Sequence, residues 1–268
     1  MARLEINGVS QGFDGMEVLH NVTLTVESGQ VACLLGPSGC GKTTLFHVVA
    51  GLAAPSAGTV LLDGEDITGR PGHLSYMLQK DLLLQHKRII DNVALPLVLR
   101  GATRQEARAR ASELFEVFGL EGTEQRWPSE LSGGMRQRAA LLRSYLFSRE
   151  CMLLDEPFSA LDAFTKADMH AWFLNVVEQV GTTALVVTHD IDEAIELADV
   201  VYVMRGNPQH GKPTRVVGSE LIDWPRADRS SFTLTEAFLL HKRRVLELLG
   251  QKDAVLQRDI KMKQSNKR

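Results

Sequence analysis

The stretch GPSGCGKTT, residues 36–44, decides the fold. It follows the apolar run at 31–35 and precedes a second apolar run at 45–49 that is typical of the start of a helix. Glycine adopts backbone angles closed to other residues, so consecutive amides can turn toward one anion while the next helix presents its positive end. The stretch therefore predicts a phosphate-binding loop between a strand and a helix.

The loop fits the nucleotide-binding spacing G-x-x-x-x-G-K-[ST] through Gly36, Gly41, Lys42 and Thr43. In this pattern the lysine reaches the terminal phosphates of a nucleotide, and the hydroxyl completes a magnesium shell. The other residues expected to contact the nucleotide are Pro37, Ser38, Gly39, Cys40 and Thr44. A chance glycine turn is the alternative, against which the strand-loop-helix setting argues. The pattern leaves open whether the nucleotide drives a machine, donates a phosphate or acts as a timer.

Composition limits the classes of protein to consider. A chain of 268 residues with 44% apolar residues can bury a proper core, as one large domain or two small ones. A net charge of −3 gives no overall attraction to nucleic acid, which we do not expect as a partner, although a local patch could exist. The cysteines lack the C-x-x-C spacing of metal or redox sites, which indicates a reduced, cytosolic compartment. No apolar run approaches the roughly 18 residues of a membrane-spanning helix.

Apolar periodicity predicts a mixed α/β fold. Alternation at 3–9 and 18–26 favours two strands of an antiparallel sheet, and 60–62 is a further short strand. The continuous apolar runs at 151–154, 184–187 and 200–203 are typical of buried parallel strands. Between them, residues 162–180 form a helix that Gly181 stops.

Residues 80–149 carry helical signals without a strand-like run, so we expect a helical subdomain inserted there. Thr103 and Glu106 form a capping box, and Gly119 is expected to close that helix. The C-terminal segment shows the same two signals: a capping box from Thr233 to Glu236 and a helix that ends at Gly250. Its apolar side is predicted to carry Leu234, Phe238, Val245 and Leu249. The basic segment 258–268 is expected to be a solvated end.

Two adjacent acids, Asp155 and Glu156, follow the buried strand at 151–154. The carboxyl ends of parallel strands are where open sheets place their ligands, and two acids there are costly without a cation. Side chains alternate along a strand, so the two acids should do different work. We expect Asp155 to face the magnesium shell and Glu156 to accept a proton from the water that attacks the γ-phosphate. The alternative is an acidic strand end that begins a turn.

His189 also emerges at the end of a predicted strand, close to Asp155 in the sheet. It is expected to contact the γ-phosphate or the water, although a lone histidine can equally be structural.

The segment Leu131-Ser132-Gly133-Gly134-Met135-Arg136-Gln137-Arg138 predicts a second helix N-terminus, with Ser132 as its cap and bare amides at Gly133 and Gly134. One reading makes these three residues a cap and hinge only. The other has this terminus bind a nucleotide held by another copy of the chain.

Taken together, these motifs resemble those of an ABC transporter ATPase subunit, and they cover residues 1–206 in the family's order. The resemblance implies a P-loop NTPase (RecA-like) core, at 1–79 and 150–206, with an N-terminal antiparallel β subdomain and an inserted α-helical subdomain at 80–149. It also implies two subunits that face each other head to tail, with ATP and Mg²⁺ at both seams. Each phosphate loop would then oppose the Ser132 helix of the other copy.

The resemblance also assigns single residues. Gln79 would bind magnesium and the attacking water, and would report the nucleotide state to the helical insertion. Asp162 would couple the two seams. Phe13 stands where the family stacks an aromatic residue on adenine, without the hydroxyl of the more usual tyrosine. Met135 replaces the usual glutamine, which puts that side-chain contact in doubt.

The stretches at 91–101 and 187–195 resemble importer cassettes for nitrate, sulfonates and taurine, and a thiamine-precursor importer is the alternative. Such a subunit implies transmembrane permease partners, indirectly an extracytoplasmic solute-binding protein, and a place at the cytoplasmic face of the membrane. Five apolar residues are candidate contacts for the permease, with internal packing as the alternative: Leu82, Leu83, Leu84, Ile89 and Ile90. Residues 207–268 form a C-terminal extension with a terminal helix and no assigned function.

Two rival classes remain. A soluble ABC ATPase of DNA repair or translation usually carries a long coiled coil or a second cassette, and this chain has neither. A small-molecule kinase would not need the Ser132 helix or an acidic pair followed by His189. Finally, the amides around Cys40 are expected to favour its thiolate, so thiol reagents should inactivate the protein.

Overall fold

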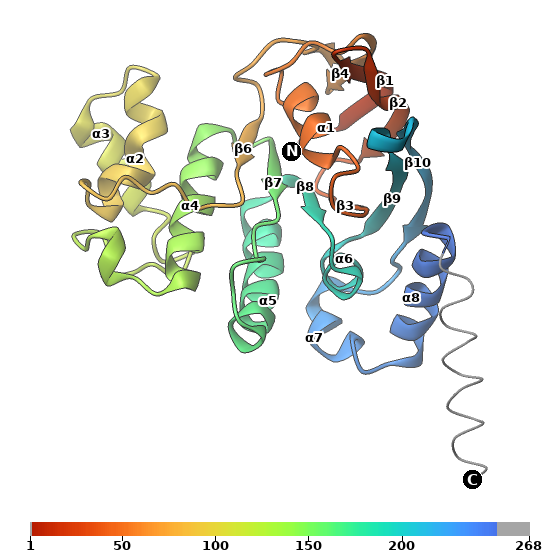
Figure 1. Ribbon diagram of the computed structural model, residues 1–268. Coiled ribbons are helices and arrows are strands. Elements are labelled where there is room, and N and C mark those ends of the chain that lie inside the picture. The colour runs from red at the N-terminus through yellow and green to blue at the C-terminus, as the bar shows by residue number, and fades with distance from the viewer. Residues whose placement is uncertain (1, 251–268) are drawn as a thin grey trace.

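The computed structural model describes residues 2–250, which form a sheet of ten strands and a separate helical lobe (Figure 1). The order of strands across the sheet is β5-β4-β1-β2-β10-β9-β3-β8-β7-β6. The strands are β1 (Leu4–Phe13), β2 (Met16–Val26), β3 (Val31–Leu35), β4 (Ala57–Leu62), β5 (Glu65–Asp66), β6 (Ser75–Met77), β7 (Cys151–Asp155), β8 (Thr183–Thr188), β9 (Val200–Asn207) and β10 (Lys212–Leu221). The helices are α1 (Lys42–Val49), α2 (Ile89–Leu99), α3 (Arg104–Ser112), α4 (Gly133–Phe147), α5 (Ala163–Val180), α6 (Ile191–Leu197), α7 (Arg229–Phe232) and α8 (Glu236–Leu248).

The centre of the sheet is parallel, as the continuous apolar runs predict. β3 lies between β8 and β9, and β7 and β6 extend the parallel set beyond β8. All five residues of β3 are buried, and they alternate between two cores. Cys33 belongs to the core that contains α5 and α6, whereas Leu34 belongs to the core that contains α1. Burial on both faces explains why this strand lacks polar alternation.

The antiparallel part of the sheet confirms the pair of strands predicted at 3–9 and 18–26. β1 pairs with β2 and with β4, and its inward residues Leu4, Ile6 and Val9 are fully buried. β10 joins the two parts, because it pairs antiparallel with β9 and touches β2 at Thr214 and Leu19. The expected boundary at residue 206 falls inside β9, and β10 beyond it belongs to the same sheet.

The helical lobe contains α2, α3 and α4, and the described residues 80–149 contain no strand. The capping box of Thr103 and Glu106 is present at the start of α3. The helix does not continue to Gly119, as the sequence predicted, but ends at Ser112. The chain tightens there into turns, such as the bond from the Phe115 amide to the Ser112 carbonyl at 3.2 Å. Phe115 and Phe118 lie in these turns, and both are buried in the core.

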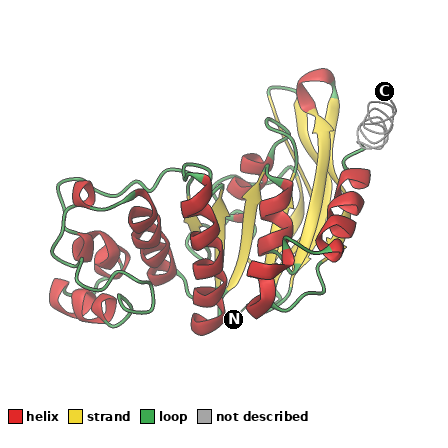
Figure 2. Cartoon of the chain, turned by 90° about the horizontal axis from the view of Figure 1, so that it is seen from below, coloured by secondary structure: helices red, strands yellow, loops and turns green. Residues whose placement is uncertain are grey.

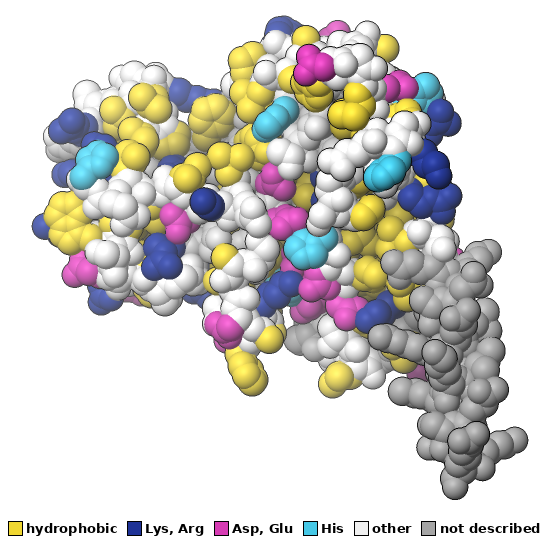
Figure 3. All heavy atoms as spheres, viewed as in Figure 1, with side chains coloured by type: hydrophobic (Ala, Val, Ile, Leu, Met, Phe, Trp, Pro, Cys, Tyr) yellow, Lys and Arg dark blue, Asp and Glu magenta, His cyan; other side chains and the backbone are white. Residues whose placement is uncertain are grey.

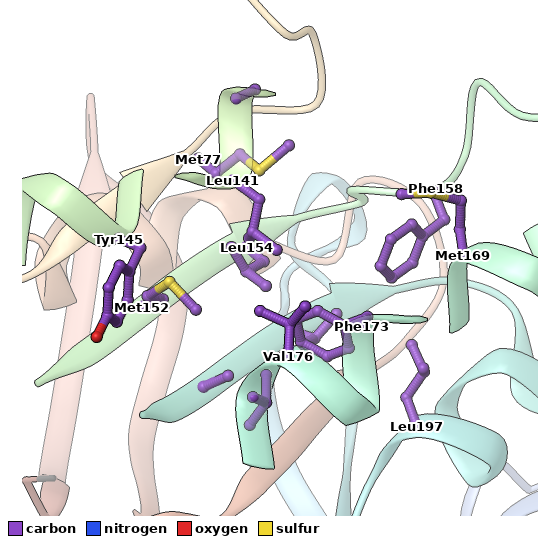
Figure 4. Close-up of a cluster of buried hydrophobic side chains, with 14 of the residues drawn as sticks. Met77, Leu141, Tyr145, Met152, Leu154, Phe158, Met169, Phe173, Val176 and Leu197 are labelled. Carbon is purple, nitrogen blue, oxygen red and sulfur yellow. The ribbon is translucent and has the colours of Figure 1, made fainter. Parts of the chain in front are cut away.

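α5 matches its prediction at both ends. Asp162 caps it by accepting from the amides of residues 164 and 165, and Gly181 ends it in the left-handed conformation. Its buried side chains Met169, Phe173 and Val176 pack under the sheet beside Leu154 (Figure 4). Viewed from below, helices lie along one side of the strands and the lobe extends from one end (Figure 2).

The C-terminal helix begins later than predicted. Thr235, not Thr233, caps α8 by accepting from the Phe238 amide at 3.2 Å, so the capping box predicted from Thr233 to Glu236 is wrong. Thr233 instead is the C-cap residue of α7. Leu234 is 92% exposed and does not join the apolar side that Phe238 and Val245 bury. The prediction for residues 258–268 lies outside the described residues.

Candidate nucleotide site

The loop at residues 36–44 connects β3 to α1 as predicted. Gly39 and Gly41 have φ angles of 75° and 100°, in the left-handed region that favours glycine. A Cβ on Gly41 would lie 2.8 Å from Cγ1 of Val18, and one on Gly36 would lie 2.8 Å from the Met204 carbonyl oxygen. Strands β2 and β9 therefore press on the loop so closely that side chains at these positions would not fit.

Lys42 stands at the centre of the loop. Its side chain is buried, and Nζ donates to the carbonyl oxygens of Gly36 at 2.7 Å and Pro37 at 3.0 Å. The ammonium is thus held against two carbonyl oxygens of the loop, where it can meet a phosphate. A cavity of about 330 Å³ opens beside it, lined from the loop by Ser38, Gly39, Gly41, Lys42, Thr43 and Thr44.

Asp155, the last residue of β7, lines the same cavity. Its Oδ2 accepts from the Thr43 hydroxyl at 3.4 Å and from the Tyr76 hydroxyl at 3.2 Å. Burial raises the pKa of Asp155, and the charge of Glu156 raises it further, against the lowering effect of the two hydroxyl bonds and Lys42. A buried carboxylate next to a second acid is stabilised by a cation.

The donor set at this point fits magnesium. Mg²⁺ prefers oxygen ligands and usually takes only one or two from protein, with phosphates and water supplying the rest. The Thr43 hydroxyl and the Asp155 carboxylate, 3.4 Å apart, are such a pair. Within residues 2–250, no group of three or more His, Cys, Asp or Glu side chains could hold a metal ion.

Glu156 is the meeting point of three segments. Its Oε1 accepts from Nδ1 of His189 at 2.9 Å, and its Oε2 accepts from the side-chain amide of Gln79 at 3.2 Å. The same amide lies 3.2 Å from the Ser159 hydroxyl. Glu156 has a φ of 45°, a conformation that costs free energy in a residue with a side chain and that clusters at functional sites. Acidic side chains gather near the middle of this face, with a histidine beside them (Figure 3).

The structure brings Gln79, Asp155, Glu156 and His189 to the edge of the loop, at the carboxyl ends of β6, β7 and β8. Their adjacency follows from the parallel strand order. Phe13 ends β1, where it is 49% exposed and pairs across the hairpin with Met16, which lines the cavity. Phe13 itself is not among the residues that line the cavity.

The helix that begins at Ser132 lies elsewhere. Ser132 caps α4 by accepting from the Met135 amide, and Gly133 and Gly134 form its first turn. Among the described residues, those that line the phosphate-loop cavity do not include these three, and Figure 1 shows α4 on the lobe side of the sheet, away from α1.

The segment after Gln79 is tied to α4. Nε of Arg136 lies 3.3 Å from a carboxylate oxygen of Asp81, and Arg143 donates to the carbonyl oxygens of Asp81 and Leu82. The two residues that follow Lys80 thus connect the Gln79 segment to the helix that Ser132 caps.

One sequence prediction, a reactive Cys40, fails here, and the prediction of five permease contacts divides between its two alternatives. Cys40 is 1% exposed, and burial raises the pKa of its thiol, an effect larger than the lowering by Lys42 and the loop amides. Its thiolate is thus disfavoured. Of the five proposed permease contacts, Leu83, Ile89 and Ile90 are buried in the core, the last two on the first turn of α2. Leu82 is exposed and Leu84 is half-buried.

The sequence reading also missed several residues. Tyr76, three residues before Gln79, reaches Asp155 from the neighbouring strand β6, a strand that the sequence analysis did not predict. Pro208 and Gln209, from the turn between β9 and β10, line the cavity although they lie beyond residue 206. No sequence pattern pointed to them. Within residues 2–250, no helix has the length and apolar character needed to span a membrane.

Comparisons with known proteins agree with this geometry. The family model for the ABC transporter matches residues 19–159. The sulfate/thiosulfate import ATP-binding protein CysA of Synechococcus elongatus is 40% identical over 226 residues, which are 83% of this chain and 64% of CysA. The formylaminopyrimidine import ATP-binding protein ThiZ of Halalkalibacterium halodurans is 43% identical over 72% of this chain and 76% of ThiZ. The spermidine/putrescine import protein PotA of Nitrosospira multiformis is 38% identical over 94% of this chain and 72% of PotA.

The fold is similar to that of the ATP-binding cassette MJ0796, solved as a dimer in a post-hydrolysis state with ADP and Pi. The match has a TM-score of 0.68 at 27% identity and covers 83% of this chain and 100% of MJ0796. With the loop, the acidic pair and the inserted lobe all in place, the chain belongs to the ABC transporter family.

Proposed function

We propose that the chain hydrolyses ATP through Glu156 and thereby powers the uptake of a small solute through a partner permease. The observation that supports this most strongly is the position of Glu156. Its two carboxylate oxygens are engaged by His189 and Gln79, beside a cavity lined by the phosphate loop. Three segments that are distant in sequence thus converge on one carboxylate.

In this mechanism each residue has one task. The Glu156 carboxylate accepts a proton from the attacking water. General base catalysis of this kind typically increases the reaction rate by about 10² to 10⁴. Because an ionised carboxylate only accepts hydrogen bonds, the contact with His189 requires the proton on Nδ1 of the ring. That leaves Nε2 to meet the water or the γ-phosphate. Gln79 orients the same water, and Lys42 offsets the negative charge of the phosphates.

Magnesium would supply charge neutralisation at the β- and γ-phosphates, held by Thr43, Asp155 and Gln79. Phe13 would stack on the adenine. The loop residues from Gly36 to Thr44 would surround the phosphates.

The active form is proposed to be a head-to-tail homodimer. Ser132, Gly133 and Gly134 present a helix N-terminus that does not line the phosphate cavity of their own chain, and such a terminus attracts an anion. The dimeric MJ0796 structures support an assembly of this kind. In it, each cavity would be completed by the Ser132 helix of the second copy.

A groove between the sheet and the lobe is the proposed permease site. A cavity of about 520 Å³ lies between the end of α1 and helices α2 and α4, with lining residues that include Leu52, Pro71, Tyr76, Pro96, Arg143 and Phe147. A second cavity, of about 680 Å³, continues it past Phe147 and adds Arg100, Arg110 and Arg149. Glu113 and Glu150 line the second cavity as well, so charges of both signs border the apolar side chains, which fit an apolar helical segment with polar flanks.

The groove is connected to the reaction centre at two points. Tyr76 lines it and contacts Asp155, and Arg143 lines it and donates to the carbonyl oxygens that follow Gln79 by two and three residues. A permease segment seated here would therefore respond to the nucleotide. The exposed Leu82 would extend the contact. These relations favour a place at the cytoplasmic face of the membrane, with an extracytoplasmic solute-binding protein reached only through the permease.

The cargo is proposed to be a small solute of the nitrate, sulfonate or taurine kind. A thiamine precursor is the second candidate, which the 43% identity to the formylaminopyrimidine protein ThiZ favours. The cassette itself does not bind the solute, so the permease decides between them.

Affinity purification from detergent-solubilised membranes tests the proposal. The wild-type chain should retain a polytopic permease, and Leu52→Asp, at an exposed position in the groove, should lose it. The control Leu239→Asp, equally exposed at 62% but on α8, should retain it. Recovery of ribosomes or DNA without a membrane protein would contradict the proposal.

A further inference from the structure

A partly buried ionic cluster lies between α5 and α6, outside the nucleotide cavity. Lys166 of α5 contacts the carboxylates of Asp190, at 3.0 Å, and Glu193 of α6. Glu193 is 3% exposed, so its charge would be costly without a cation beside it. Burial alone would lower the pKa of Lys166, but the hydrogen bonds to Glu193 and Asp190 raise it, which keeps the ammonium charged.

Asp190 gives this cluster its connection to the reaction centre, because it directly follows His189. Its Oδ1 caps α6 by accepting from the amides of residues 192 and 193, and its Oδ2 accepts from Lys166. Its own amide donates to the Thr188 hydroxyl at 3.0 Å. The backbone on both sides of His189 is thus fixed by contacts in which Asp190 takes part.

The other side of the cluster reaches the Glu156 segment. His170, one turn after Lys166 on α5, is 4% exposed and contacts Glu196 of α6 through Nδ1 at 2.9 Å. Its ring packs edge-on against Phe158, with centroids 5.1 Å apart, and Phe158 also packs on Phe173 at 5.6 Å. Figure 4 shows Phe158 beside Phe173 and Met169. Phe158 follows Glu156 by two residues, so α5 contacts the Glu156 segment and the His189 segment at once.

We infer that Lys166 is a positioning residue for ATP hydrolysis: its ammonium, between Asp190 and Glu193, holds the His189 segment where the ring meets Glu156. The inference rests on the roles proposed for Glu156 and His189. Lys166 touches neither the nucleotide cavity nor these two side chains, and it acts by fixing the start of α6. ATP binding, which the loop at 36–44 provides, should therefore not depend on it.

The geometry also explains why a lysine serves here. Without it, the Glu193 carboxylate would be buried against α5 with no ammonium beside it. Moving the start of α6 away from α5, toward water, would relieve that cost and carry His189 with it. A displacement of about 1 Å at a catalytic group can cost about 100-fold in rate.

The test compares Lys166→Met with Lys166→Arg, and measures kcat and the KM for ATP. Lys166→Met, which keeps an unbranched side chain of nearly the same length but removes the charge, should lower kcat about tenfold or more and leave KM unchanged. Lys166→Arg keeps the charge and should restore most of the rate. Equal losses in kcat and in affinity for ATP, or no rescue by arginine, would overturn the inference, because a merely structural role predicts both.

Asp190→Asn keeps the test decisive if Lys166→Met does not fold. Asparagine caps a helix about as well as aspartate, so α6 should remain capped while the ion pair with Lys166 is lost. This variant should also lower kcat without a change in KM. The matched control is Lys242→Met, which removes the ion pair between Lys242 of α8 and Asp192 of α6 and should leave hydrolysis unchanged.

His189→Ala, measured in parallel, separates the inference from the proposed mechanism. If it hydrolyses ATP normally, the role proposed for His189 fails, and the role of Lys166 fails with it. If His189→Ala loses hydrolysis but Lys166→Met and Asp190→Asn do not, the mechanism stands and only the role of Lys166 is refuted.

Discussion

Nδ1 of His189 lies 2.9 Å from Oε1 of Glu156, although 33 residues separate them in sequence. The contact arises because β7 and β8 are adjacent parallel strands that end at the same edge of the sheet. The amide of Glu156 also donates to the Val187 carbonyl at 3.0 Å, so backbone and side chain bind the two strand ends together. This arrangement gives the carboxylate a fixed position beside the phosphate loop.

Glu156→Gln should abolish hydrolysis but not nucleotide binding. Glutamine keeps the size of the side chain and can still contact His189 and Gln79, but it cannot accept the proton of the water. We expect phosphate release to fall about 100-fold or more, with little change in the affinity for a fluorescent ATP analogue. Glu178→Gln, at an exposed position on α5, is the control. Normal turnover in Glu156→Gln would remove it from the role of base.

Tyr76→Phe should weaken the response to magnesium. The Tyr76 hydroxyl donates to Asp155 Oδ2 and so helps to orient the carboxylate that we expect at the metal. Loss of a partner that orients a metal ligand typically costs about tenfold or more in metal affinity. The Mg²⁺ concentration needed for tight binding of the fluorescent analogue should rise accordingly. Tyr202→Phe, whose hydroxyl donates to the Thr25 carbonyl, should not shift this curve, and an identical shift in both variants would count against the role of Tyr76.

The native protein should react slowly with thiol reagents. Cys33, Cys40 and Cys151 are all buried, and burial raises the pKa of each thiol, that of Cys151 to about 12. A raised pKa means that less thiolate is present at any given pH below it, so labelling at pH 8 should be slow and should quicken as the pH rises. In denaturant all three should react rapidly. Fast labelling of Cys40 in the folded chain at pH 8 would show that the loop amides outweigh burial after all.

Arg229→Met should destabilise the fold. Arg229 is 2% exposed and ties the C-terminal segment to the end of the sheet by donating to five carbonyl oxygens, those of Ile195, Glu196, Ala198, Ile222 and Trp224. Methionine fills similar space but leaves these buried acceptors without a donor, which should cost about 3 kcal/mol of unfolding free energy. Urea denaturation measures the loss. Arg243→Met, at an exposed position on α8, should leave the midpoint unchanged.

Local chemistry made much of the fold and site predictable. The strand ends that carry Asp155, Glu156 and His189 were visible as apolar runs followed by polar residues, and the parallel sheet then brings them together. The loop at 36–44 was recognisable because glycines and a lysine at this spacing, between a strand and a helix, are typical of phosphate binding.

Other features depend on tertiary packing that no local pattern encodes. Thr233 and Thr235 are equally good caps by residue type, and only the turn after α7 selects Thr235. The amides around Cys40 suggested a reactive thiol, but burial between the loop and the sheet outweighs them. β10 completes the sheet without a clear alternating pattern because its partners, β2 and β9, specify it.

The central claim is that one chain supplies the phosphate loop and a second copy supplies the Ser132 helix. Light scattering on Glu156→Gln with ATP and Mg²⁺ tests this most directly. We predict a species of twice the 29.6 kDa mass of the chain, formed only with ATP and lost in Glu156→Gln that also carries Ser132→Arg. A protein that stays at the mass of one chain with saturating ATP, or a dimer indifferent to Ser132→Arg, would contradict the claim.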